Sequence, residues 1–235
     1  MSVFSKNKKL WQIKGKGAEI MGIYVNPGNT AFEMARFSDI YVDKSRLINK
    51  INHVYRTEQR FVCVSRPRRF GKSMAANMLT AYYSRGCDSA ELFSGLAIEQ
   101  DASYKKHLNQ HNVIRLDIQQ FLESRRDLDT FMGEMERAVV EELMEEFPEC
   151  HGFDPGSRLK VALNKIFNQT KTGFIFILDE WDCVFRIAKE QKETQKDYLD
   201  FLRGLFKGQD YINLVYMTGI LPIKKYGEHS AVNML

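Results

Sequence analysis

The sequence has no long hydrophobic run. No apolar stretch approaches the roughly 18 residues needed to span a bilayer, and the N-terminus has no hydrophobic core of a signal peptide. We therefore expect a cytoplasmic protein without a membrane partner.

Cysteine is sparse and dispersed. The four cysteines are Cys63, Cys87, Cys150 and Cys183. They include no CxxC pair, and no histidine stands at a spacing typical of a zinc site. We interpret them as reduced thiols, which argues against a disulfide framework and a zinc centre.

The chain also lacks a strong charge of either sign. Its 34 basic and 30 acidic residues leave a net charge of +4, too little to predict nucleic-acid binding from bulk charge. A length of 235 residues with 44% hydrophobic content is enough for one globular domain, which we place at residues 21–235. Residues 1–20 are lysine-rich and aperiodic, and we interpret them as a solvated basic tail, with nucleic-acid contact as the alternative.

The segment Val62–Ser73 is the most informative part of the chain. An apolar strand runs into a loop that ends in Gly71, Lys72 and Ser73. A helix beginning near Gly71 would direct its unpaired N–H groups and the positive end of its dipole at an anion. Lys72 would add a charge beside the terminal phosphates, and the Ser73 hydroxyl would hold Mg²⁺. The pattern predicts a nucleotide site.

One position of this loop departs from the usual phosphate-loop pattern. Glycine is expected five residues before Gly71, where this chain has Arg66. A different loop shape is therefore predicted, in which Pro67 fixes a turn and the arginines offer planar charged donors to phosphate oxygens. The alternative is a solvated basic turn before an ordinary helix. The predicted nucleotide-binding residues are Arg66, Pro67, Arg68, Arg69, Phe70, Gly71, Lys72, Ser73 and Met74.

A second segment supports the same chemistry. The apolar run Phe174–Leu178 is followed directly by Asp179 and Glu180. The run is short and does not alternate, as in a strand that is buried on both faces of a parallel sheet. Asp179 is then suited to hold Mg²⁺ and Glu180 to orient and deprotonate a water. Taken alone, the acidic pair could instead be a helix N-cap.

Further elements follow from periodicity. One helix carries the apolar residues Leu47, Ile48, Ile51 and Val54, and another covers residues 73–83. A strand is expected at 112–117, then a long helix with an apolar stripe, a helix around 159–166, a helix over 197–206 and a strand over 212–217. The stripe consists of Leu128, Met132, Met135, Val139 and Leu143. The opposite face is acidic at Glu134, Glu141, Glu142, Glu145 and Glu146, which we interpret as a solvated face, with a basic partner as the alternative.

These segments together resemble the AAA-ATPase-like family of bacterial P-loop proteins. The resemblance rests on Arg66–Ser73, Asp179–Asp182 and Thr218–Leu221 and extends from about Met21 to Gly227. In that family a glycine-poor loop of the form Arg-Pro-Arg-Arg-Phe-Gly-Lys-Ser is usual. Trp181 is a small departure, since tyrosine is commoner after the acidic pair.

The resemblance implies a fold and further roles. The implied fold is α/β, a P-loop NTPase of three α/β/α layers with a mainly parallel sheet, of the additional-strand class. It also implies that Thr218 ends the strand between the loop strand and the acidic strand and helps to position the attacking water. A buried threonine that caps a strand is the alternative. Family members often carry a downstream nuclease-like domain, and we expect this core to be C-terminally incomplete at Leu235.

The leading hypothesis is Mg²⁺-dependent ATP hydrolysis, with nucleotide as the binding partner. The predicted catalytic residues are Glu180, Lys72 and Thr218, and the metal ligands are Ser73 and Asp179. The alternative is a regulatory switch that binds nucleotide with little or no hydrolysis and controls an effector domain or protein. A nucleic-acid module that uses the loop arginines ranks last. If the chain is an enzyme, we expect an ATPase, a hydrolase that acts on phosphoanhydrides.

Overall fold

A single parallel sheet forms the centre of the computed structural model, which describes residues 22–123 and 130–221. The strands are β1 (Phe61–Ser65), β2 (Asn112–Asp117), β3 (Phe174–Asp179) and β4 (Ile212–Gly219). Their order is β1-β4-β3-β2, and every neighbouring pair is parallel. The expected α/β class with a parallel sheet is confirmed.

Strand β3 shows why this sequence forms a strand covered on both faces. Phe174, Phe176 and Leu178 belong to one apolar cluster, whereas Ile175 and Ile177 belong to a second. Side chains alternate between the faces of a strand, so a strand buried on both sides needs an apolar residue at every position. Each such side chain contributes about 1.5–3 kcal/mol when it is fully buried.

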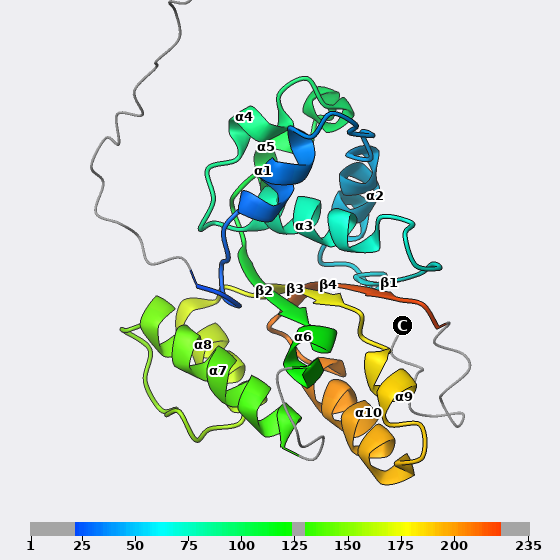
Figure 1. Ribbon diagram of the computed structural model, residues 1–235. Coiled ribbons are helices and arrows are strands. Elements are labelled where there is room, and N and C mark those ends of the chain that lie inside the picture. Colours follow the sequence, from blue (N-terminus) through cyan, green and yellow to red (C-terminus); the bar gives the residue numbers. More distant parts are fainter. Residues whose placement is uncertain (1–21, 124–129, 222–235) are drawn as a thin grey trace, which may run out of the picture.

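Helices cover both faces of the sheet (Figure 1). One face carries α1 (Thr30–Arg36), α2 (Arg46–Val54), α3 (Lys72–Tyr83), α4 (Ala90–Phe93) and α5 (Tyr104–His107), together with the 3-10 helix η1 (Ala97–Gln100). The other carries α6 (Ile118–Glu123), α7 (Phe131–Glu146), α8 (Leu159–Thr170), α9 (Cys183–Ile187) and α10 (Lys192–Phe206). Among the described helices, none combines the length and the apolar character needed to cross a membrane.

Most predicted elements are confirmed, and several boundaries differ, among them the end of α8, which continues to Thr170. Helix α10 begins at Lys192 and not at Asp197, because its first turn is polar and the apolar periodicity starts only at Tyr198. Strand β4 continues past Met217 to Gly219. In the stripe of α7, Met135, Val139 and Leu143 are buried and Met132 is half-buried. Leu128 lies outside the described residues.

The acidic face of α7 is not simply solvated. The Glu142 carboxylate accepts the backbone N–H groups of Ile23, Tyr24 and Val25 at 3.0, 2.8 and 2.8 Å. It thereby fixes the segment in which Val25 forms an antiparallel bridge with Ile114 of β2. Glu146 binds the side chains of Asn26 and Arg85. The interpretation as a solvated face is therefore wrong for Glu142 and Glu146, because periodicity does not show which distant segment packs against a helix.

Candidate nucleotide site

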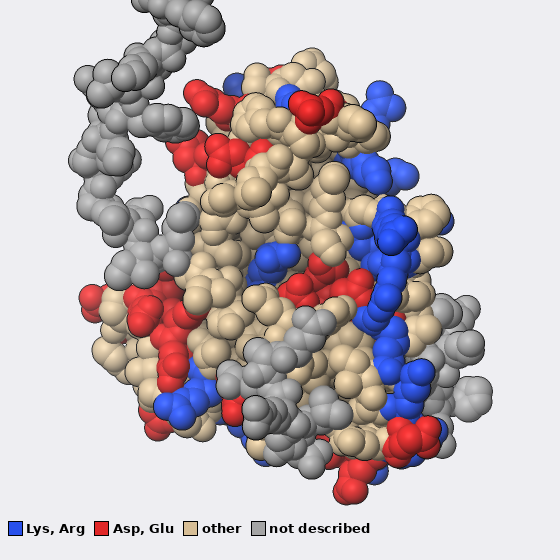
Figure 2. All heavy atoms as spheres, viewed as in Figure 1, with Lys and Arg blue, Asp and Glu red and all other residues tan. Residues whose placement is uncertain are grey.

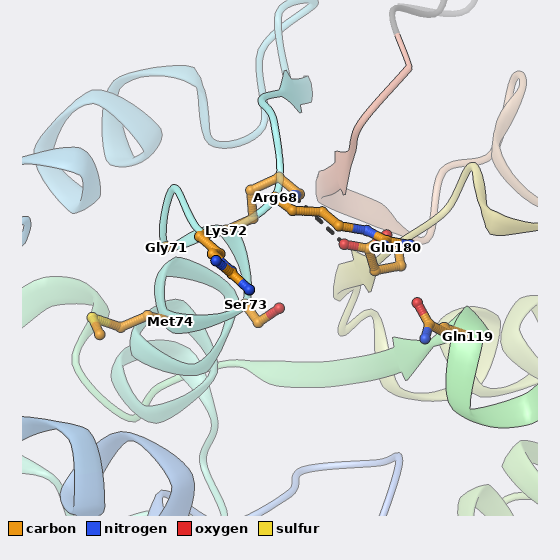
Figure 3. Close-up of a pocket in the computed structure, with 8 residues that line it drawn as sticks. Arg68, Gly71, Lys72, Ser73, Met74, Gln119 and Glu180 are labelled. Atoms are coloured by element: carbon orange, nitrogen blue, oxygen red, sulfur yellow. Dashed lines mark ion pairs between the residues drawn. The ribbon is translucent and has the colours of Figure 1, made fainter. Parts of the chain in front are cut away.

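The predicted site residues meet at one edge of the sheet. Because all strands are parallel, their carboxyl ends lie together, which is where open α/β sheets place their ligands. A pocket of about 410 Å³ lies at this edge. It is lined by Arg68, Arg69, Gly71, Lys72, Ser73, Met74, Gln119 and Glu180. Figure 3 shows the start of α3 on one side of the pocket and Glu180 and Gln119 on the other, with the Met74 side chain pointing away from them.

The shape of the loop explains its missing first glycine. Positive φ angles occur at Arg69 (68°) and Gly71 (77°), whereas Arg66 has none. A glycine is therefore not required at position 66. The backbone N–H of Arg66 instead donates to the Gly219 carbonyl oxygen at 3.1 Å, which ties the start of the loop to the end of β4. Gly71, in the left-handed conformation, is the N-cap of α3.

Lys72 and Glu180 face each other, as the sequence predicts. The Lys72 ammonium lies 3.5 Å from Glu180 Oε1, and these side chains are only 5% and 17% exposed. The same ammonium donates to the Pro67 carbonyl oxygen at 3.4 Å. The loop after β1 and the acidic pair after β3 thus share one pocket, and a shielded ammonium at a helix N-terminus is suited to bind an anion.

Asp179 lies behind the pocket in a polar cluster. It is 1% exposed, and its Oδ1 accepts the Thr218 hydroxyl and, at 3.1 Å, the Glu180 N–H. Asp117 is its register partner on β2. Burial, and also the charge of Asp179, raise the pKa of Asp117. The ends of β2 and β3 therefore concentrate negative charge next to the basic loop.

Glu180 is held by two cations. In addition to Lys72, Arg186 of α9 donates through Nη2 to Glu180 Oε2. Glu180 has a φ of 50°, a left-handed conformation that is uncommon for a non-glycine residue. Such backbone strain is often found at functional sites.

Asp182 joins the ends of two strands. It is fully buried, and its Oδ2 accepts the N–H groups of Ile220 at 3.0 Å and Leu221 at 2.7 Å. The Trp181 N–H donates to the Thr218 carbonyl oxygen at 3.0 Å. These bonds fix the segment after β3 against the end of β4.

Three residues of the site were missed by sequence reasoning. Gln119 lines the pocket from α6, Arg186 binds Glu180, and Lys44 donates to the Phe70 carbonyl oxygen at 3.4 Å. Gln119 follows the predicted strand 112–117 closely, so its place at the same edge could have been inferred. Nothing local in the sequence indicates the contacts of Lys44 and Arg186.

Five predicted residues do not line the pocket. They are Arg66, Pro67, Phe70, Asp179 and Thr218. The first three belong to the exposed outer part of the loop, and the last two are buried behind it. The predicted nucleotide-binding loop therefore divides into a pocket wall, with Arg68, Arg69 and residues 71–74, and an outer part.

The oxygen donors of the site are of the kind that Mg²⁺ prefers. Mg²⁺ usually binds one or two carboxylates and keeps several waters or phosphate oxygens as its other ligands. The Ser73 hydroxyl lines the pocket and the Asp179 carboxylate lies behind it, which fits this pattern. In the described part of the chain, no group of three or more His, Cys, Asp or Glu residues forms a dedicated metal cage.

Acidic and basic side chains also lie next to each other on the molecular surface. Figure 2 shows Asp and Glu side chains gathered near the centre of the face seen in Figure 1, next to a column of Lys and Arg side chains. Such a juxtaposition is suited to an anion that is bound together with a cation.

Comparison with known proteins identifies the family of this chain. No curated protein and no solved structure matches the chain. The family described as Predicted AAA-ATPase matches residues 28–227, which include every residue of the pocket. This chain belongs to that AAA-ATPase-like family.

Proposed function

We propose that this protein binds ATP with Mg²⁺ in the pocket between the Lys72 loop and Glu180, and that it hydrolyses the nucleotide. The observation that carries the proposal is the 3.5 Å approach of Lys72 Nζ to Glu180 Oε1, across one pocket and between two segments far apart in sequence. Family membership supports an ATPase-like role.

The topology supports assignment to the additional-strand class of three-layer P-loop folds. Strand β4 lies between the loop strand β1 and the acidic strand β3, and helices cover both faces of the sheet. In this arrangement the polar residue near the end of the inserted strand reaches the acidic strand. The hydrogen bond from Thr218 to Asp179 is such a contact.

Each residue of the pocket has a role in this proposal. Lys72, Arg68 and Arg69 bind phosphate oxygens together with the N–H groups at the start of α3. Ser73 and Asp179 would hold Mg²⁺, which neutralises phosphate charge when bound. Thr218 orients Asp179, because its hydroxyl already donates to that carboxylate.

Glu180 is the proposed general base. A bond forms between the water oxygen and the γ-phosphorus while the bond from that phosphorus to the bridging oxygen breaks. The electron pair stays on the ADP oxygen, and the water proton passes to Glu180 and then to a phosphate oxygen. General-base groups typically contribute about 10²–10⁴-fold to a rate.

Two substitutions test the site. Glu180→Gln should lower ATP turnover by about 10²-fold or more while ATP still binds. Lys72→Ala should weaken ATP binding by about 3 kcal/mol, because a charged donor to phosphate is lost in a shielded site. Calorimetric titration with ATP and a non-hydrolysable analogue, with and without Mg²⁺, measures binding, and phosphate release measures turnover.

Matched controls are available on exposed side chains. Glu190→Gln, near the acidic pair in sequence, and Lys50→Ala on α2 make the same chemical changes at exposed positions outside the pocket. Unchanged turnover in Glu180→Gln would remove Glu180 from the mechanism. An unaltered ATP titration of Lys72→Ala would contradict the phosphate site itself.

A regulatory switch is the second candidate, and one observation favours it. The Glu180 carboxylate is already engaged by Lys72 and Arg186, so a bound phosphate must compete for Lys72. In a switch, nucleotide changes protease sensitivity without appreciable single-turnover hydrolysis. Appreciable hydrolysis in a single turnover would favour the ATPase.

A further inference from the structure

The two oxygens of Glu180 have different partners. Oε1 lies 3.5 Å from Lys72 Nζ, and Oε2 accepts a hydrogen bond from Arg186 Nη2. The three side chains are 5%, 17% and 20% exposed for Lys72, Glu180 and Arg186. In such shielded surroundings a charge-assisted hydrogen bond is stronger and more directional than on an open surface.

The two cations lie differently relative to the pocket. Lys72 lines it and starts α3, where phosphate oxygens would bind. Arg186 belongs to α9 and is not among the residues that line the pocket. A polyphosphate can therefore draw Lys72 away from Oε1 but leaves the contact between Arg186 and Oε2 in place.

Arg186 also forms a longer ion pair with a buried carboxylate. Its Nη2 lies 3.8 Å from Oδ1 of Asp182, the buried carboxylate whose Oδ2 accepts two N–H groups at the end of β4. One guanidinium nitrogen thus lies between Glu180 and a residue fixed to the sheet. The guanidinium group is planar, so an arginine loses less conformational entropy for each hydrogen bond than a lysine would.

We propose that Arg186 is a positioning residue that holds Oε2 of Glu180, so that Oε1, once Lys72 turns to the phosphates, faces the attacking water. The proposal rests on the proposed ATPase function and goes beyond it, since it assigns a role to a residue outside the pocket. It also explains how Lys72 and Glu180 can pair in this structure and still act on different parts of one nucleotide.

The kinetic test is a substitution that removes only the guanidinium. Arg186→Met should lower kcat by about tenfold to a hundredfold, because a misplaced base loses much of its effect, and should change KM and ATP affinity little. Arg186→Lys should restore part of kcat. In the Glu180→Gln background, Arg186→Met should cause no further loss, because two residues acting as a unit are not additive.

Arg137→Met is the matched control. Arg137 forms an exposed ion pair with Glu141 on α7, so this variant removes an arginine and an ion pair away from the pocket, and kcat should not change. If Arg186→Met leaves kcat unchanged, or lowers ATP affinity and thermal stability without a specific loss of kcat, the positioning role is overturned.

A crystal structure with Mg²⁺ and a non-hydrolysable ATP analogue gives a readout independent of turnover. We expect the contact between Arg186 and Glu180 to persist and that between Lys72 and Glu180 to be broken. A chain that binds the analogue with Arg186 turned away from Glu180 overturns this inference alone. A chain that does not bind the analogue overturns the proposed function and this inference with it.

Discussion

At the scale of single residues, Thr218 shows how one hydroxyl can shape a site from outside the pocket. It is fully buried, and its hydroxyl donates to Asp179 Oδ1. Hydrogen bonds to charged groups contribute about 1.5–3 kcal/mol. Since this hydroxyl donates to Asp179, the geometry favours a role of Thr218 in orienting the proposed metal ligand over direct contact with water.

Thr218→Val should weaken the part of ATP binding that depends on Mg²⁺. Valine keeps the shape but removes the donor, so Asp179 is held less firmly, whereas the phosphate contacts of Lys72 are untouched. Titrations of ATP with and without Mg²⁺ measure the two parts separately. Thr218→Ser keeps a hydroxyl and should stay close to wild type. Equal Mg²⁺ dependence in the valine variant and wild type would contradict the role.

Some contacts of single residues could be predicted from the sequence, and others could not. The proximity of Lys72 and Glu180 could be predicted, because each lies in the segment after an apolar strand and parallel strands end at one edge. The contacts of Arg186 and Lys44 could not be predicted, because they depend on the path of a short helix and a connecting loop. Only the φ angles of the loop show why arginine can replace the usual glycine at position 66.

At the scale of elements, the most informative contact is that of α7 with the segment before α1. The Glu142 carboxylate accepts three consecutive backbone N–H groups, from Ile23 to Val25. Periodicity predicted α7 and its apolar stripe, since both are local properties. It could not predict this contact, which joins residues more than a hundred positions apart.

Glu142→Gln should lower the free energy of unfolding by about 1–3 kcal/mol, because an amide replaces a charged acceptor and leaves backbone donors unsatisfied. Urea denaturation measures the change. Glu141→Gln is the control on the same helix. Within the described residues Glu141 forms an exposed ion pair with Arg137, so this substitution should lower the free energy of unfolding by about 0.5 kcal/mol or less. Equal losses in the two variants would contradict a special role for Glu142.

At the scale of the whole molecule, stability should depend on pH through a pair of histidines, of which His107 is buried and His111 is half-buried. His107 Nδ1 lies 2.9 Å from His111 Nε2, and the rings of Tyr55 and Tyr83 pack against them. Burial, and also the neighbouring His107, lower the pKa of His111 to about 4. Burial, and also Lys106, lower the pKa of His107. The folded protein therefore keeps this pair uncharged at pH values where the unfolded chain is protonated.

The free energy of unfolding should fall as the pH drops from about 6.5 towards 4, because the unfolded chain then binds protons that the folded protein excludes. For His111 the loss amounts to roughly 3 kcal/mol across this range. His111→Gln should flatten the profile, whereas His151→Gln, at an exposed position, should leave it unchanged. Urea denaturation at several pH values measures the slopes, and parallel profiles for His111→Gln and wild type would contradict the assignment.

The end of β4 reaches both halves of the pocket. The Gly219 carbonyl oxygen binds the start of the Lys72 loop, while the Thr218 carbonyl oxygen and the N–H groups of Ile220 and Leu221 bind the segment that carries Glu180. A displacement of this strand would therefore shift both walls together, and we expect it to change the distance between Lys72 and Glu180.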